Sequence, residues 1–151
     1  MDSHLSSEVT QVKILIIDGQ SGRLGVQIIE GLKKSGLSAS HTLIAIGTNA
    51  LATSAMINAG ADNGATGENP VVVQCRTADV IAGPIGITLA DAMLGEVSPH
   101  IAAAVGQSNA LRVLLPSDRC NTFIAGTGAM TRRQLVDAAV ERIMLAISEA
   151  T

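Results

Sequence analysis

The stretch from Val12 to Gly25, VKILIIDGQSGRLG, constrains the fold more than any other part of the chain. An apolar run that only one lysine interrupts ends at Asp18, and three glycines follow at three-residue spacing, at Gly19, Gly22 and Gly25. Apolar residues at helical spacing begin immediately afterwards. A strand, a glycine-rich turn and a helix in this order are typical of dinucleotide-binding units, because glycine lets the backbone approach a pyrophosphate and the helix start directs free amides at it. The stretch therefore predicts a phosphate-binding turn.

Apolar runs alternate with helical patterns along the rest of the chain, which indicates a parallel sheet covered by helices. Strands are expected at Val12–Ile17, His41–Ile46, Val71–Cys75, Val80–Gly83 and Leu111–Leu115, with a weaker sixth at Thr122–Ala125. Helices are expected at about Arg23–Ser35, Ala50–Ala59, Gly86–Leu94 and Ser98–Val105 and after Thr131, with a loop from Gly60 to Pro70. Right-handed crossovers then favour an α/β, doubly wound, Rossmann-like fold of three αβα layers, with about six strands in the order 3-2-1-4-5-6.

The composition bounds the domain count and the partners. A chain of 151 residues suits one domain with one core, so residues 1–11 are expected to form a flexible tail and residues 12–151 a single Rossmann-like domain. The net charge of −3 argues against a nucleic-acid partner. No apolar run approaches the roughly 20 residues of a membrane span, and the first residues lack the apolar core of an export signal, so a cytoplasmic protein without a membrane partner is expected. Abundant alanine and glycine favour helix faces shared within a homo-oligomer.

Ligands on such sheets bind beyond the carboxyl ends of the strands, near the point where the strand order reverses, and this rule selects three loops. The candidate cofactor-binding residues in them are Gly19, Gln20, Ser21, Gly22, Arg23, Leu24, Gly25, Gly47, Thr48, Asn49, Gly83, Pro84, Ile85 and Gly86. Each loop also has a purely structural interpretation. Gly25 can serve helix packing alone, Asn49 can cap the following helix, and the turn after the fourth strand can simply end that strand.

Two features of these loops bear on the ligand. Arg23, in the first turn of its helix, either pairs with phosphate oxygens or remains solvated. The second strand ends at Gly47-Thr48-Asn49, without the carboxylate that usually accepts hydrogen bonds from the ribose of NAD. Because a hydroxyl and an amide can donate hydrogen bonds to a 2′-phosphate, NADP is favoured over NAD.

The remaining polar residues show no pattern typical of catalysis or of a metal site, so no catalytic residue is assigned. The loose carboxylate candidates, which caps and turns mostly explain, are Asp18, Glu68, Asp91, Glu96 and Asp118. The two thiols, Cys75 and Cys120, are expected on opposite sides of the sheet, and His41 is expected at the end of the sheet away from the ligand.

Two resemblances to known families add to these expectations. The turn GQSGRLG is similar to the GxxGRMG-type turn of dihydrodipicolinate reductases and related nicotinamide-binding folds. Longer segments resemble a small bacterial family known only as a domain of unknown function; among them are IGTNALATSAMINAGADNGATGEN, ADVIAGPIGI, LADAMLGEVSP and AVGQSNALRVLLP. That resemblance extends from Lys13 to the final helix. It implies a cytoplasmic, single-domain, Rossmann-like protein, and it implies no activity, substrate or catalytic residue.

Four functions stay open on the sequence. The favoured one is binding of a nucleotide, most of all NADP or NAD, by a sensor or by the cofactor module of an assembly. The second is a small oxidoreductase that a partner subunit completes, although the chain contains no tyrosine and no pairing of a histidine with an acid. The third is binding of another phosphate-bearing small molecule, such as coenzyme A or a flavin, on the same turn. The last is a structural subunit with a vestigial site.

Overall fold

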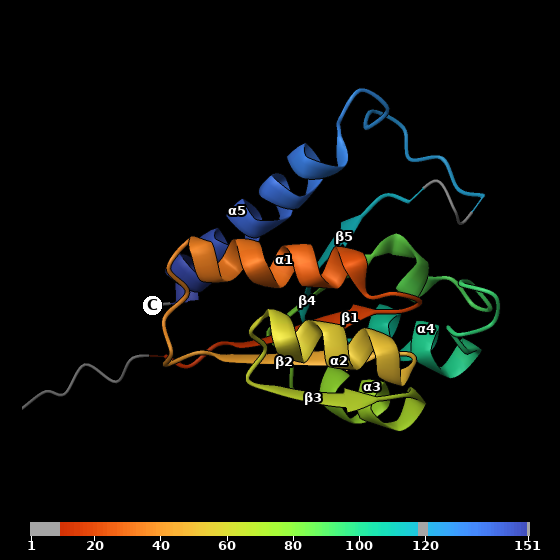
Figure 1. Cartoon of the computed structure of the whole chain (residues 1–151), viewed down its shortest axis with the longest axis horizontal. Helices are drawn as coiled ribbons and strands as arrows, with labels where there is room; N and C mark the ends of the chain where they lie inside the picture. Colours follow the sequence, from red (N-terminus) through yellow and green to blue (C-terminus); the bar gives the residue numbers. More distant parts are fainter. Residues whose placement is uncertain (1–9, 118–120, 151) are drawn as a thin grey trace, which may run out of the picture.

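The protein is an α/β structure built on five parallel strands (Figure 1). The computed structural model describes residues 10–117 and 121–150. The strands are β1 (Lys13–Asp18), β2 (Thr42–Gly47), β3 (Asn63–Thr66), β4 (Val80–Pro84) and β5 (Leu111–Leu115), and they lie side by side in the order β3-β2-β1-β4-β5. Every neighbouring pair is parallel. The sheet therefore reverses its direction of winding at β1 and β4.

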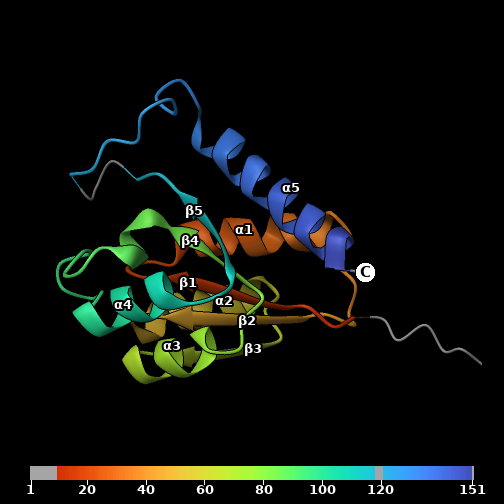
Figure 2. The ribbon, with the colours of Figure 1, turned by 180° about the vertical axis from the view of Figure 1, so that it is seen from behind.

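The helices cover both faces of the sheet. They are α1 (Arg23–Lys34), α2 (Ala50–Ala59), α3 (Glu68–Cys75), the short 3-10 helix η1 (Ile85–Thr88), α4 (Pro99–Gln107) and α5 (Arg132–Ala150). One apolar cluster joins α1, α2 and α5 to one face of the sheet, and a second joins α3, η1 and α4 to the other. Figures 1 and 2 show α1 beside α5 on one side and α3 beside α4 on the other. The three layers agree with the predicted αβα arrangement.

The central strand explains why this layering forms. Residues 14–17 of β1, all Ile or Leu, are fully buried, with alternate side chains in the two clusters. A strand that is apolar on both faces must be covered on both faces, and parallel connections place helices there. No helix among residues 10–117 and 121–150 is long and apolar enough to cross a membrane.

The third strand was predicted at the wrong place in the sequence. Val71–Cys75, predicted as a strand, belongs to α3, where Val71 and Cys75 are the buried residues, one helical turn apart. The true β3 lies within the segment expected to be a loop. It pairs with β2 alone, and most of its residues are exposed, so its sequence carries no apolar run. Short polar strands are usual at the edge of a sheet.

Two further elements differ from the predictions. The helix expected at Gly86–Leu94 is only η1, which a loop of residues 89–98 follows. Asp91, Met93 and Leu94 have φ values of 66°, 57° and 57°, which no helix accommodates. The sixth strand expected at Thr122–Ala125 is not formed, because this segment has no strand pairing. Most of the predicted tail, residues 1–9, and Cys120 lie outside the described residues.

The helix caps agree with the sequence. Asn49 accepts a hydrogen bond from the amide of Ala52 at the start of α2. Pro99 occupies the first turn of α4. Thr131 and Gln134 bond each other's amides reciprocally at the start of α5, which is the capping-box arrangement. These caps fix where three helices begin.

Candidate functional site

A cavity of about 700 Å³ opens beyond the carboxyl ends of β1, β4 and β5. The glycine turn, residues 19–22 between β1 and α1, forms one wall, and described residues between β5 and α5, in the ranges 116–117 and 122–130, form the opposite one. Figure 1 shows that these segments and the loop after η1 gather at one end of the sheet. This is the end at which open α/β sheets bind ligands.

The structure divides the predicted site residues into two groups. Those that line the cavity are Gly19, Gln20, Ser21, Arg23, Leu24 and Pro84. Those that do not are Gly22, Gly25, Gly47, Thr48, Asn49, Gly83, Ile85 and Gly86. Most of the predicted residues that line the cavity therefore come from the first loop, and none come from the loop after β2.

Protein contacts explain several of the glycines in the second group. A Cβ atom on Gly22 would lie 2.9 Å from the Cα atom of Ala52, and one on Gly25 would lie 2.5 Å from the Sδ atom of Met56. Both distances are shorter than van der Waals contact, so these glycines let α1 pack closely on α2. Gly83 is similar, because a Cβ atom there would lie 2.1 Å from the carbonyl oxygen of Ile17.

A buried carboxylate occupies the underside of the glycine turn. Asp18 is 5% exposed. Its Oδ1 atom accepts a hydrogen bond from the amide of Gly19, and its Oδ2 atom accepts one from the amide of Gly25, both at 2.8 Å. Burial raises the pKa of Asp18, and the hydrogen bonds and the charge of Arg132 only partly offset this effect. Two amides that the glycine pattern offers to a phosphate are therefore already bonded within the chain.

Two cationic side chains line the cavity. Arg23 begins α1 and Arg132 begins α5, and both line the cavity. Within residues 10–117 and 121–150, no carboxylate lies within ion-pair distance of either guanidinium, and no acceptor bonds the amides of Ser21 and Arg23. Helix starts carry a partial positive charge, so two of them with an arginine each create a positive region in the cavity.

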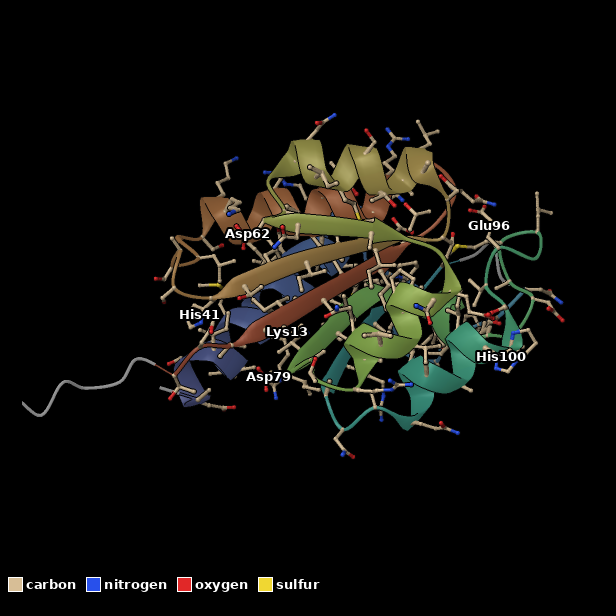
Figure 3. All side chains as sticks on the ribbon, turned by 90° about the horizontal axis from the view of Figure 1, so that it is seen from below. Lys13, His41, Asp62, Asp79, Glu96 and His100 are labelled. Carbon is tan, nitrogen blue, oxygen red and sulfur yellow. The ribbon has the colours of Figure 1, made fainter. Side chains whose placement is uncertain are left out.

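A second carboxylate, Glu96, closes the other side of the glycine turn, next to β2. Its Oε1 atom accepts hydrogen bonds from Thr48 Oγ1 at 2.8 Å, Asn49 Nδ2 at 2.5 Å and the amide of Gln20 at 3.1 Å. Burial opposes ionisation of Glu96, but the hydrogen bonds from Asn49, Gln20 and Thr48 outweigh it and lower the pKa. Figure 3 shows Glu96 at the end of the sheet opposite to Lys13 and Asp79.

The other chemistry-bearing residues lie apart from the cavity. His41 lies with Lys13 at the far end of the sheet (Figure 3), as predicted, and its Nδ1 atom accepts a hydrogen bond from the amide of Val12. Burial raises the pKa of the Cys75 thiol to about 11. The part of the chain that the structure describes contains no cluster of His, Cys, Asp or Glu able to hold a metal ion. The described polar groups of the cavity can bind an anion.

Several lining residues were missed by sequence reasoning. Arg132 could have been found, because the capping box locates the start of α5 and a helix after a parallel strand begins at the ligand end of the sheet. Met93, Leu94 and the described residues of the segment between β5 and α5 carried no such signal. Their positions depend on how loops fold over the sheet.

The chain matches the model of a known protein family. The model of a family described as Domain of unknown function (DUF3842) matches residues 13–148. A search of curated proteins found no match to the sequence.

Proposed function

The chain belongs to the family described as Domain of unknown function (DUF3842), and we propose that it binds a phosphate-bearing small molecule of the nucleotide class in the cavity beside the glycine turn. The observation that carries the proposal is the pair of guanidinium groups on Arg23 and Arg132. Both line one cavity, and neither forms an ion pair within contact distance of a carboxylate among residues 10–117 and 121–150, although the charge of Arg132 acts on Asp18. Guanidinium groups match phosphate oxygens in pairs, which makes them suited to this ligand.

The backbone supports the same ligand. The amides of Ser21 and Arg23 have no acceptor among the described residues and stand at the start of α1. Free amides at a helix start bind phosphate groups well.

The cavity has room and a surface for a planar ring. Its volume falls within the usual range of small-molecule sites, about 300–1,000 Å³. Phe123, the only aromatic residue of the chain, lines it and is 83% exposed. An exposed aromatic side chain beside a phosphate site suits a nucleotide, whose base can stack on it.

NAD and NADP belong to the proposed ligand class, together with flavin nucleotides and coenzyme A. The sequence favoured NADP because no carboxylate follows β2. Glu96 supplies one from a different loop, and its Oε1 atom bonds both Thr48 and Asn49. A 2′-phosphate would meet this negative charge, so the site does not favour NADP over NAD.

The test is thermal unfolding with NAD, NADP, FMN, FAD, coenzyme A, ATP and inorganic pyrophosphate. A ligand at a hundred times its dissociation constant adds about 2.7 kcal/mol to the free energy of unfolding. We expect Arg132→Gln to remove most of the shift that the best ligand produces. Arg133→Gln is the matched control, since Arg133 is the next residue of α5 and does not line the cavity. The proposal fails if none of the compounds raises the midpoint at millimolar concentration, or if the two variants weaken binding equally.

A further inference from the structure

The loop of residues 89–98 fills the side of the glycine turn that lies next to β2. A Cβ atom on Gly19 would lie 2.6 Å from the Sδ atom of Met93 and 3.4 Å from Oε1 of Glu96. The Oγ1 atom of Thr48 would lie 2.5 Å from the same Cβ atom. Protein atoms of the loop and of Thr48 therefore pack against the first glycine of the turn on this side, while Met93 of the same loop also lines the cavity that extends towards β4 and β5.

Glu96 accepts hydrogen bonds from the polar groups that a second nucleoside would need on the side of the turn next to β2. In dinucleotide-binding sheets, the ribose of one nucleoside lies at the end of the second strand, where an acidic side chain accepts its hydroxyl hydrogen bonds. Here the donors at that place are Thr48 Oγ1, Asn49 Nδ2 and the amide of Gln20, and all three donate to one oxygen of Glu96. A ribose that is to bond these three groups must displace Oε1 of Glu96 from them.

The loop that carries Glu96 is held in place by its own hydrogen bonds. The amide of Asp91 donates to the carbonyl of Val97 at 2.7 Å, and the amide of Val97 donates to the carbonyl of Ala92 at 3.1 Å. Val97, next to Glu96, is fully buried in the cluster beneath α4. The positive φ values of Met93 and Leu94 are strained for residues with side chains. Such strain persists where surrounding contacts determine the conformation, and it concentrates at functional sites.

We infer that Glu96 acts as a specificity residue that closes the second nucleoside position, so that the ligand carries a single nucleoside and is not a dinucleotide. The inference rests on the proposed function, since it concerns the same phosphate site. On the open side, Arg132 and Phe123 line the cavity and offer a guanidinium group to the phosphate and a ring to one base. On the closed side, the carboxylate also repels a further phosphate group.

The experiment is isothermal titration of the full chain with matched pairs, AMP and NMN against NAD, and AMP and FMN against FAD. The tightest-binding mononucleotide is expected to bind at least tenfold more tightly than the dinucleotide that contains it. In Glu96→Ala the dinucleotide is expected to gain at least tenfold in affinity, while the mononucleotide changes less than threefold. Glu30→Ala is the control, because Glu30 is an exposed residue of α1 that does not line the cavity.

A wild-type protein that binds the dinucleotide as tightly as the mononucleotide overturns the inference and leaves the proposed function standing. A Glu96→Ala protein with an unchanged ratio of affinities also overturns it. If Glu96→Ala does not fold, Glu96→Gln takes its place: it removes the charge and keeps an acceptor oxygen, and the affinity ratio must still fall at least threefold. If no mononucleotide, dinucleotide or pyrophosphate binds at all, the proposed function fails, and the inference fails with it.

Discussion

The Oδ2 atom of Asp18 accepts a hydrogen bond from the amide of Gly25, seven residues further along the chain, at 2.8 Å. The other carboxylate oxygen bonds the amide of Gly19 at the same distance. One buried side chain thus joins the end of β1 to the first turn of α1 and fixes the shape of the glycine turn between them. The shape of the turn that the proposed ligand contacts therefore depends on the Asp18 carboxyl group, which bonds an amide in the first turn of α1 as a helix cap does.

Replacing this carboxyl group by an amide removes one of its two acceptor atoms. In Asp18→Asn one backbone amide is left buried without a partner, which costs about 1–3 kcal/mol. Urea unfolding followed by circular dichroism measures this loss. Asp137→Asn, at an exposed position on α5, is the control and is expected to change stability by less than about 0.5 kcal/mol. Equal losses in the two variants would contradict the role given to Asp18.

The raised pKa of Asp18 makes its contribution depend on pH. A carboxyl group with a higher pKa in the folded state binds its proton more tightly there, so protonation favours folding. The stability that this group contributes therefore rises as the pH falls through the folded pKa towards the unfolded value of about 3.9. The difference in unfolding free energy between wild type and Asp18→Asn is expected to widen over this range. A difference that narrows on acidification would show that the pKa is lowered instead.

Glu96 is expected to show the opposite dependence. Its folded-state pKa is lowered, so the stability that it contributes is fully present above the unfolded value of about 4.3 and is lost as the pH falls through the folded pKa. In Glu96→Gln this component is absent. The midpoint of urea unfolding is therefore expected to fall more steeply with decreasing pH for wild type than for Glu96→Gln below this pH. Parallel curves would mean that the three hydrogen bonds to Oε1 do not favour the ionised form.

The sequence predicts those elements of the fold whose burial requires a recognisable pattern of apolar residues. β1 and β2 were predictable, because strands covered on both faces need long apolar runs. The edge strand β3 was not, because Asn63–Thr66 is mostly exposed and reads as a turn. The run Val71–Cys75 reads as a strand from its three consecutive valines, but Pro70 lies in the first turn of a helix, which tolerates proline, and only one face of that helix is buried.

The candidate site was predictable only where it lies on the first strand–turn–helix unit. Gly19, Arg23 and Leu24 line the cavity because the start of α1 faces the ligand end of the sheet. Glu96 was named only as a loose carboxylate, because its meeting with Asn49 joins residues 47 positions apart across a loop without regular structure. Local sequence carries no signal of such a contact.

Gly22 tests whether the turn requires glycine for conformation alone. Both Gly22 and Gly36 have positive φ, 73° and 83°, so an alanine at either position is strained by about 1–2 kcal/mol. A Cβ atom on Gly36 meets nothing within 4 Å, whereas one on Gly22 meets the backbone of Ala52. Gly22→Ala is therefore expected to cost about 1–3 kcal/mol more than Gly36→Ala in urea unfolding, because overpacking adds to the strain. Equal costs would show that α1 and α2 can separate without loss.

Asn49 and Ser98 separate the role of a helix cap from that of a site residue. Each caps a helix by accepting a hydrogen bond, from Ala52 in α2 and from Ile101 in α4, and loss of such a cap costs about 1 kcal/mol. Ser98 also donates to Glu68 at an exposed position, where a bond to a charge adds little. Asn49 in addition donates to the carbonyl of Gln20 and to Glu96.

Because Asn49→Ala loses these two part-buried bonds as well as the cap, it is expected to cost about 2–3 kcal/mol, against about 1 kcal/mol for Ser98→Ala. Urea unfolding of both variants measures the two costs. A double-mutant cycle of Asn49→Ala with Glu96→Ala isolates the shared bond, and a coupling energy of about 0.5–3 kcal/mol is expected. If the two single costs are equal and the coupling is zero, Glu96 does not hold the side of the turn next to β2, and the exclusion of a second nucleoside loses its physical basis.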